Sequence, residues 1–515
     1  MAPALSTRYS RVLLDLLAAA AGALFPFAFA PCGIGPLAIG CAAFLFFLWR
    51  HSSPRRAALR GFLFGLGQFG TGVSWVYTSM HDFGGAGVVE GMGLTALLVA
   101  YLALYPALAG YWTSLWGREI RGPLRSIGVA ATAWVAADWL RGWLLTGFPW
   151  LQLGYSQVDT ALGLGFAPLA GVYGVGFATA SIAASLSVAA SIGGSRRDRL
   201  VALIAASVVV LAGSAMAGIR WTESAGEPIR AALLQGNIGQ AQKWLPETRQ
   251  ATLRRYRELT RRHWGSKLVV WPETAVPAFY HQVQDGFLRE LADEAAGHRT
   301  DLLIGMPVLD HDSGRYYNAL VVVGAEPAMY YKRHMVPFGE YLPFRHVFGF
   351  VAELLQIPMA NFERGNERQG LLHAGGYPLA ASICYEDGFG HESRMGLPEA
   401  AYVVNVTNDA WFGRSPEPHQ HLQMARMRAL EAGRYLLRAT NTGVTAILSP
   451  RGEVIAQAPL FEEAAVSASI YPMRGATPYV VLGDWSMAGV LLLTGVAVGY
   501  PQWERMRRRA VLETG

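Results

Sequence analysis

Long apolar runs alternate with short arginine-bearing segments over the first 220 residues, and one further apolar run follows a long polar stretch. A run of about 20 apolar residues, at about 1.5 Å rise per residue, covers the roughly 30 Å hydrocarbon core of a bilayer. Most of these runs are therefore long enough to be membrane-spanning helices. The eight predicted spans are residues 12–31, 34–49, 57–78, 86–116, 126–145, 163–192, 200–218 and 484–503.

Between residues 228 and 470 the pattern changes to short β-rich runs separated by amphipathic helices. This alternation predicts an α/β domain with its own core. Pro450-Arg451-Gly452-Glu453 is predicted to be a hairpin turn, in which Gly452 takes the positive φ. The predicted strands are Ile229–Gln235, Lys267–Trp271, Asp301–Gly305, Ala319–Val323, Met329–Lys332, Leu379–Cys384, Ala401–Val406 and Gly443–Leu448, and the predicted helices are Pro246–Trp264, Asp285–Ala296 and His419–Leu437.

Arginine clusters lie beside alternate ends of the spans, and the intervening short loops lack them. By the positive-inside rule both termini are predicted to be cytoplasmic. The predicted organisation is a seven-helix transmembrane region (1–221), an extracytoplasmic domain (222–475), and an eighth span with a basic tail (476–515). In the alternative, the first span is a cleaved signal peptide. We expect it to be retained, because its apolar stretch exceeds a usual signal core and Pro31 precedes Cys32.

The composition supports a membrane protein, since 52% of residues are hydrophobic, 16% are charged and the mean hydropathy is +0.24. The net charge of +6 arises from arginines beside the spans, so no nucleic-acid partner is predicted. Asp138 and Arg141, three residues apart in the fifth span, share a helix face. We expect them to neutralise each other, with contact to a lipid headgroup as the alternative.

Cys384 is the one cysteine of the polar region, because Cys32 and Cys41 lie within or beside apolar spans. It has no partner for an internal disulfide, and a free thiol in an oxidising compartment favours a reactive role over that of a buried inert cysteine. Glu273 in Trp-Pro-Glu and Lys332 in Tyr-Tyr-Lys-Arg-His also stand at predicted strand ends. Taken singly, the first is typical of a solvated carboxylate and the second of a surface charge.

Together the three residues have the chemistry of nucleophilic catalysis. Glu273 can take the thiol proton, Lys332 can stabilise a thiolate and an oxyanion, and each charge favours the other. Backbone N–H groups after Cys384 would complete an oxyanion hole if the strand ends in a sharp elbow. No His/Cys/Asp cluster has metal spacing, and His419 and His421 would point apart on a helix, so no metal or cofactor is predicted.

Trp271-Pro272-Glu273, the Lys332 segment and Cys384-Tyr385-Glu386 resemble the Glu-Lys-Cys triad of the nitrilase, or carbon-nitrogen hydrolase, superfamily. With eight spans around such a domain, the whole chain resembles the bacterial apolipoprotein N-acyltransferase family. Further similar strings are Gln235-Gly236-Asn237-Ile238, Trp139-Leu140-Arg141-Gly142, Gly147-Phe148-Pro149-Trp150 and Asn408-Asp409-Ala410-Trp411-Phe412-Gly413.

The resemblance implies an αββα sandwich on the periplasmic side of the inner membrane. It implies that Cys384 takes an acyl chain from a phospholipid as a thioester and passes it to the N-terminal amine of a diacylglyceryl-cysteine on an apolipoprotein. Glu273 would be the general base and Lys332 the oxyanion stabiliser. The supporting site residues it implies are Glu340, Tyr385, Glu386, Trp244 and Asn318.

The apolar segment 346–362 follows Glu340 closely and is predicted to be a lid or membrane-dipping element, with an ordinary core helix as the alternative. Two other functions remain open from the residues alone. A membrane-tethered amidase would use the same triad with water as acceptor, whereas a transporter with a binding domain would leave the triad without a role.

Overall fold

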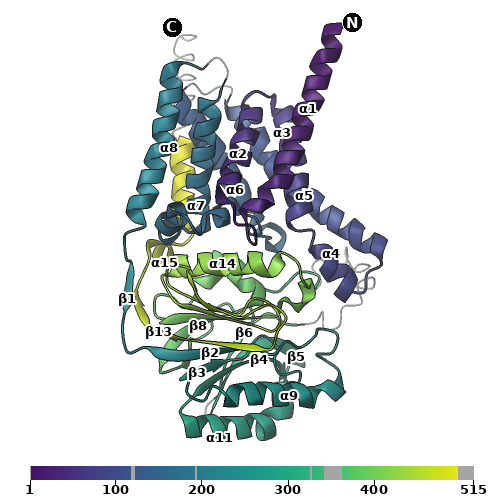
Figure 1. Ribbon diagram of the computed structural model, residues 1–515, viewed down its shortest axis with the longest axis vertical. Helices are drawn as coiled ribbons and strands as arrows, with labels where there is room; N and C mark the ends of the chain where they lie inside the picture. Colours follow the sequence, from purple (N-terminus) through teal and green to yellow (C-terminus); the bar gives the residue numbers. More distant parts are fainter. Residues whose placement is uncertain (1, 118–121, 192–193, 325–326, 342–361, 497–515) are drawn as a thin grey trace. The chain divides into compact units, whose positions relative to one another are not determined.

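The computed structural model describes residues 2–117, 122–191, 194–324, 327–341 and 362–496 (Figure 1). The chain divides into two compact units. The helical unit comprises Met1–Ser74, Leu94–Ile219 and Leu482–Gly515, and the mixed unit comprises Trp75–Gly93 and Arg220–Val481. The predicted lid, residues 346–362, lies outside the described residues except for its last position.

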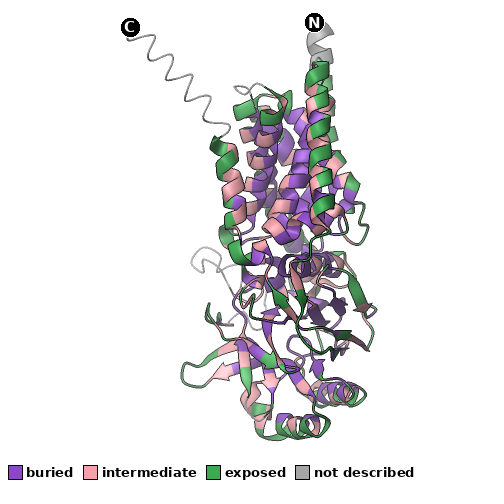
Figure 2. Cartoon of the chain, turned by 90° about the vertical axis from the view of Figure 1, so that its left-hand side faces the viewer, coloured by how far each residue is buried: buried purple, intermediate pink, exposed green. Residues whose placement is uncertain are grey.

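Each predicted span overlaps a helix among the described residues. Residues on helix α8 (Arg196–Met216) show why these helices suit a lipid environment: only Ala202 and Gly213 are buried, whereas Leu203 and Leu211 are 48% and 67% exposed. The described part of the first helix is similar, with Val12 and Leu13 49% and 57% exposed, and Figure 2 shows exposed positions along it. The long helices are α1 (Ala2–Leu24), α2 (Gly35–Arg50), α3 (Pro54–Gly72), α5 (Val88–Gly117), α6 (Pro123–Arg141), α7 (Ala161–Ala189), α8 (Arg196–Met216) and the helix Trp485–Val496.

Among the described residues, four helices are long and apolar enough to cross a membrane: Ser10–Ala28, Val88–Gly117, Ala161–Ala189 and Arg196–Met216. Gly35–Arg50 and Trp485–Val496 are apolar but shorter. The prediction of a membrane-spanning helical region is thus confirmed in its coarse form.

Charged side chains inside the helical unit are paired. The predicted Asp138–Arg141 pair is confirmed, with Arg141 Nη2 donating to Asp138 Oδ1 at 2.9 Å. Arg141 also donates to the carbonyls of Phe148 (2.7 Å) and Trp150 (2.6 Å), so the pair holds the loop after α6. This full set of partners supports a structural role for the pair.

The mixed unit contains two six-stranded sheets whose facing sides form one apolar core. The first sheet has the order β13-β2-β3-β4-β5-β6 and the second has the order β12-β11-β10-β9-β8-β7. The strands are β2 (Ile229–Gln235), β3 (Leu268–Val270), β4 (Asp301–Asp310), β5 (Arg315–Val323), β6 (Ala328–Tyr331), β7 (Leu372–Ala374), β8 (Tyr377–Ile383), β9 (Tyr402–Thr407), β10 (Leu436–Thr440), β11 (Ala446–Leu448), β12 (Val454–Gln457) and β13 (Ala464–Ile470), with β1 (Thr222–Ser224) pairing with β14 (Met473–Gly475).

Helices cover the outer face of each sheet. Leu253 and Tyr256 of α9 (Pro246–Arg261) and Leu291 of α11 (Arg289–His298) pack on the first sheet, while α14 (Glu417–Ala432) packs on the second. The predicted αββα sandwich is therefore confirmed. Because both faces of the inner strands are covered, they read as nearly continuous apolar runs such as the fully buried β9.

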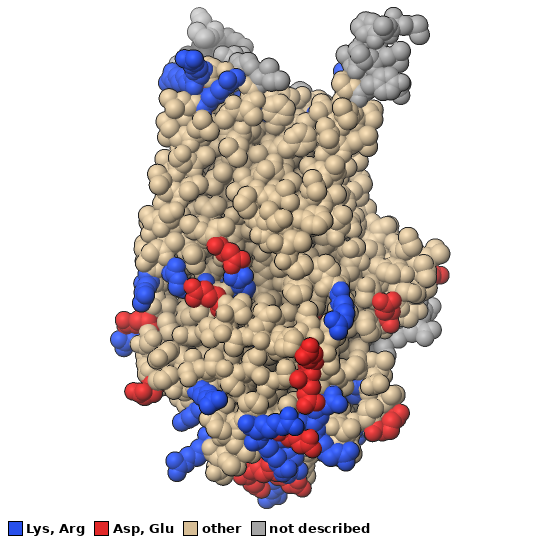
Figure 3. Space-filling model, viewed as in Figure 1, with Lys and Arg blue, Asp and Glu red and all other residues tan. Residues whose placement is uncertain are grey.

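The solvent side of the first sheet's helices is charged. Figure 3 shows Lys, Arg, Asp and Glu side chains gathered over α9 and α11. Arg261 Nη2 lies 2.8 Å from Glu294 Oε1 between these helices, and Arg257 pairs with the same carboxylate. Such exposed pairs contribute little to stability but keep this face polar.

Sequence reasoning misplaced the ends of the predicted helices: Pro246–Trp264 ends at Arg261, Asp285–Ala296 corresponds to Arg289–His298, and the largest error is at α14. The predicted helix His419–Leu437 ends at Ala432, because Gly433 takes a left-handed φ of +60° and closes it, and β10 begins three residues later. Strands β12 and β13 were also missed, since their exposed and half-exposed positions weaken the apolar signal. The hairpin turn at Pro450–Glu453 is confirmed between β11 and β12, with Gly452 at φ +71°.

One segment of the mixed unit, Trp75–Gly93, lies in the sequence between two parts of the helical unit. Trp75–Gly93 contains α4 (Val76–Thr78) and a π-helical turn (Ser79–Phe83). Trp75 Nε1 donates to Gln420 Oε1 of α14 at 3.1 Å, and its ring meets the ring of Phe412 at 5.0 Å. The predicted span 57–78 extended into this segment, since its aromatic residues are as apolar as those of a bilayer helix.

Candidate active site

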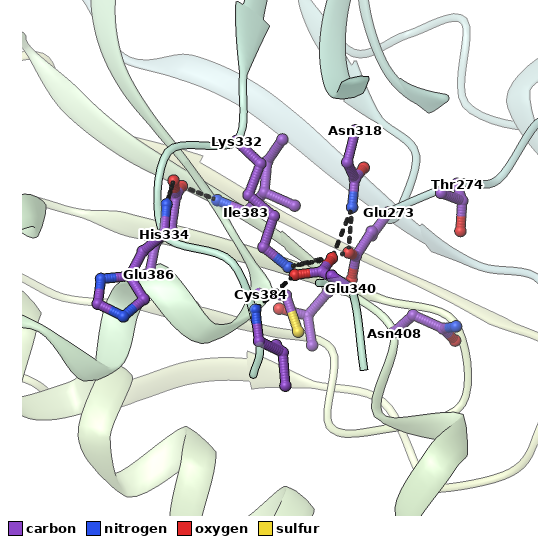
Figure 4. Close-up of polar contacts among 12 residues, drawn as sticks. Glu273, Thr274, Asn318, Lys332, His334, Glu340, Ile383, Cys384, Glu386 and Asn408 are labelled. Atoms are coloured by element: carbon purple, nitrogen blue, oxygen red, sulfur yellow. Dashed lines mark hydrogen bonds and ion pairs between the residues drawn. The ribbon is translucent and has the colours of Figure 1, made fainter. Parts of the chain in front are cut away.

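The three predicted catalytic residues stand at strand ends of both sheets. Glu273 lies three residues after β3, Lys332 directly after β6, and Cys384 directly after β8. Strands β2, β3 and β4 run parallel, as do β8, β9 and β10, so their carboxyl ends gather at sheet edges where polar side chains can meet. Figure 4 shows the three side chains pointing toward one another.

Cys384 occupies a sharp elbow, which is the condition set above for an oxyanion hole of backbone N–H groups. Its φ is +53°, in the left-handed region that side chains seldom adopt, and it begins the 3-10 turn Cys384–Gly388. The residue is half-buried and is a free thiol. Burial raises the pKa of the Cys384 thiol well above its ordinary value and the Glu273 charge adds to this, while Lys332 acts in the opposite direction. A base is therefore needed to generate the thiolate.

Lys332 connects two carboxylates. Its Nζ lies 2.7 Å from Glu340 Oε1 and 3.5 Å from Glu273 Oε1, and the side chain is 1% exposed. Burial alone would lower the pKa of Lys332, but Glu340 and Glu273 outweigh it and raise this pKa above its usual value. The lysine thus remains a cation next to the thiol.

Asn318 fixes the direction of the base. Its Nδ2 donates to Glu273 Oε1 at 2.6 Å and lies 3.4 Å from Glu340 Oε1. Its backbone carbonyl accepts from the Lys332 N–H at 2.8 Å, which joins β5 to the lysine. Glu340 in turn accepts from the Val336 N–H at 2.8 Å, so each carboxylate has a defined orientation. The predicted supporting residues Asn318 and Glu340 are thus brought into contact with the triad.

Glu386 ties the lysine segment to the cysteine segment. Its fully buried carboxylate accepts from the N–H groups of Arg333 (2.5 Å), His334 (3.1 Å) and Ile383 (2.6 Å) and from the Tyr330 hydroxyl (2.9 Å). Burial raises its pKa, as does the charge of Glu392, although the Arg333 guanidinium opposes both. These bonds set the distance between the ends of β6 and β8.

The other two predicted supporting residues lie at the margin. The buried Tyr385 ring packs against Phe389 at 5.0 Å and His334 at 5.5 Å between ring centres. Trp244 is half-buried in the turn before α9, and no described hydrogen bond or ring contact joins it to Cys384.

Sequence reasoning missed Lys243, the neighbour of Trp244. Its Nζ donates to the Glu273 carbonyl at 3.2 Å and to the Thr274 hydroxyl, and it is 2% exposed. Gly305 permits this close turn, because a Cβ there would lie 2.3 Å from the Pro272 carbonyl oxygen. The scarcity of lysine in this chain was the available signal.

A second buried charge cluster lies behind the elbow and was also missed. The Arg438 guanidinium contacts Asp387 (2.6 Å), Asp409 (3.2 Å) and the side-chain oxygen of Asn405 (2.9 Å). His421 joins the same two aspartates, at 2.6 Å and 3.2 Å. Asn405 Nδ2 reaches the Cys384 carbonyl at 3.4 Å, so the cluster supports the elbow.

Three potential metal ligands, Asp409, Glu417 and His421, meet in this cluster, although sequence spacing indicated no such group. Glu417 and His421 are four residues apart on one face of α14, and sequence reasoning compared His421 only with His419. The Arg438 guanidinium already contacts Asp409 and Asp387, so the positive charge that these carboxylates require comes from the protein.

Comparisons with known proteins agree with this arrangement. A carbon-nitrogen hydrolase family model matches residues 230–479, so the mixed unit carries a domain of that class. A model of the apolipoprotein N-acyltransferase N-terminal domain matches residues 21–185.

Three relatives named apolipoprotein N-acyltransferase match nearly the full chain. The protein of Methylococcus capsulatus is 55% identical, with 92% of this chain and 94% of the relative covered. Those of Nitrosomonas europaea (45%; 91% and 94%) and Vibrio cholerae (39%; 97% and 99%) follow. The chain belongs to the apolipoprotein N-acyltransferase family. The amidase alternative is accordingly less supported.

Proposed function

We propose that this chain transfers a fatty acyl chain from a phospholipid to the N-terminal amine of a diacylglyceryl-cysteine on an apolipoprotein. The observation that carries the mechanism is the convergence of Glu273, Lys332 and a half-buried Cys384 thiol where strand ends of the two sheets meet. A cysteine can hold the acyl group between two substrates, which divides the transfer into two easier steps.

In the first step Glu273 takes the thiol proton, and the Cys384 sulfur attacks the ester carbonyl carbon of the phospholipid. Lys332 stabilises the oxyanion of the tetrahedral intermediate. The bond to the glycerol oxygen then breaks, and Glu273 returns the proton to that oxygen. The products are a lysophospholipid and a Cys384 thioester.

In the second step the lipoprotein amine attacks the thioester carbonyl carbon. Glu273 accepts a proton from the amine and passes it to the departing Cys384 sulfur, so an amide forms and the free thiol returns. Asn318 and Glu340 keep Glu273 and Lys332 aligned through both steps. Tyr385, Glu386 and Trp244 complete the proposed site.

The proposed setting is the bacterial inner membrane. Residues 1–221 would supply seven spans and 476–515 the eighth, with both termini cytoplasmic and the catalytic domain, 222–475, on the periplasmic side. The alternation of arginine clusters along the chain supports this orientation. Both lipid substrates would then reach the thiol by lateral diffusion.

Mass spectrometry of purified protein incubated with phospholipid and a diacylated lipopeptide tests this function. We expect an acyl group on Cys384 without acceptor, and a triacylated peptide once acceptor is added. The Cys384→Ala variant should form neither, whereas Cys41→Ala, at a buried position in α2, should form both. Triacylated peptide from Cys384→Ala would refute the mechanism.

A further inference from the structure

Lysine is rare in this chain, and its placement is selective. The sequence has 43 lysines and arginines, of which only Lys243, Lys267 and Lys332 are lysines. Lys267 is exposed, whereas Lys243 and Lys332 are 2% and 1% exposed, and both contact the Glu273 turn. Two of the three lysines therefore stand in one buried site, where a compact ammonium fits better than a planar guanidinium.

Lys243 holds the backbone that carries the base. Its ammonium donates to the carbonyl of Glu273 and to the hydroxyl of Thr274, the next residue. Thr274 has a φ of +46°, which is strained for a β-branched side chain. Both acceptors are neutral oxygens, so among the described residues these bonds leave the charge of Lys243 without a carboxylate in ion-pair contact.

The charges around the thiol balance only when Lys243 is counted. Glu273 and Glu340 carry two negative charges, and Lys332 supplies one positive charge against them. Asp409 also acts on Cys384, but Arg438 and His421 both pair with it and with Asp387, so that cluster has its own two cations. A protonated Lys243 makes the site neutral, and moving the thiol proton to Glu273 preserves that neutrality.

We propose that Lys243 is a second positioning cation of the active site, which holds the Glu273 turn and offsets the negative charge that accompanies the Cys384 thiolate. This inference rests on the proposed function, in which Cys384 is the nucleophile and Glu273 the base. Burial lowers the pKa of Lys243 to about 8, while the Glu273 and Cys384 charges oppose that shift. The residue is thus charged at neutral pH and loses its charge as the pH rises through about 8.

The test compares Lys243→Met with Lys267→Met, both in the full chain in detergent. Alkylation of Cys384 by iodoacetamide, followed by peptide mass spectrometry over a range of pH, reports thiolate formation without any lipid. We expect Lys243→Met to be alkylated about tenfold more slowly than the parent protein at pH 7, where Lys243 carries its charge. Lys267→Met should match the parent protein.

Thioester formation from phosphatidylethanolamine micelles gives the second readout. We expect at least about a tenfold loss in Lys243→Met. The rate of the parent protein should decline above about pH 8, and Lys243→Arg, whose charge persists, should lack that decline. A decline that persists in Lys243→Arg would contradict the proposal. This comparison does not require Lys243→Met to fold.

An alkylation rate at pH 7 unchanged in Lys243→Met would overturn the proposal, even with a lower melting temperature, because a purely structural lysine changes stability alone. Failure of the parent protein to form a thioester would instead refute the proposed function. The alkylation rate at pH 7 would still report on Lys243, so the two failures are distinguishable.

Discussion

Two of the buried charge clusters of the mixed unit, those around Glu273 and Arg438, differ in the cation at their centre. Around Glu273 the cations are lysines, and the neighbouring thiol is half-buried. Around Arg438 the cation is a guanidinium with three anchored contacts, and every charged member is at most 1% exposed. The comparison teaches that similar charges serve different ends: an arginine fork fixes geometry, whereas compact ammonium groups leave room for a reacting atom.

The largest effect is expected from disrupting the catalytic cluster around Glu273 while the cluster around Arg438 stays intact. Glu273→Gln keeps the shape of the side chain but removes the base, so thioester formation should fall by roughly 10²–10⁴-fold with the melting temperature little changed. Stopped-time mass spectrometry of Cys384 measures the rate. Glu290→Gln, at an exposed site on α11, is the control and should behave as the parent protein. Full activity in Glu273→Gln would exclude it as the base.

The second-largest effect is expected from disrupting the cluster around Arg438. Arg438→Met leaves Asp387 and Asp409 buried with His421 alone between them, which should lower the free energy of unfolding by about 3–5 kcal/mol. Urea denaturation in detergent measures it. Arg474→Met, which removes an ion pair that is 68% exposed on both sides, should cost at most about 1 kcal/mol. Equal losses in the two variants would contradict the difference drawn between the clusters.

A smaller effect sharpens the role of orientation in the catalytic cluster. Asn318→Ala removes the 2.6 Å bond to Glu273, a hydrogen bond to a charged group, and should slow thioester formation by about tenfold or more. The rate with saturating lipid should carry the loss, because the base is misdirected rather than the lipid excluded. Asn366→Ala, at an exposed site, is the matched control. An unchanged rate in Asn318→Ala would show that Lys332 alone orients Glu273.

The smallest effect concerns how the cluster around Arg438, which includes Glu417, changes stability with pH. Burial raises the pKa of Glu417 to about 7, with the Asp409 charge adding to the shift. Between about pH 4.5 and 7 the unfolded chain releases this proton while the folded protein keeps it, so stability falls as pH rises. Glu417→Gln should remove about 1–3 kcal/mol of that fall, measured by urea denaturation at pH 5 and pH 8. A fall of equal size in the variant would assign it to other groups, such as His421.

The sequence predicted those parts of the fold that depend on local pattern. Strand β2 has the predicted bounds, and Glu273, Lys332 and Cys384 stand at strand ends because each follows a buried apolar run. Strand β13 escaped prediction because its half-exposed positions carry no clear alternation.

The remainder depends on contacts between distant residues. Arg438 meets Asp387 across 51 positions, and Lys243 meets Thr274 across 31. No spacing rule links such residues, since the first pair comes from the turn after β8 and from β10 of one sheet and the second from the loops after β2 and β3 of the other. A lysine or arginine in a string of letters looks like a surface charge, and its burial becomes visible only when the partners on both sides are known.

The docking of Trp75 on α14 has a consequence for the order of events during synthesis. Trp75 and its partner Gln420 are 345 residues apart. At about 5–20 residues per second, roughly 20–70 s separate their emergence from the ribosome. During that interval the aromatic segment Trp75–Gly93 has no α14 to cover it. A fragment limited to residues 222–475 would lack this segment, so expression of the catalytic domain alone should include Trp75–Gly93 on a linker.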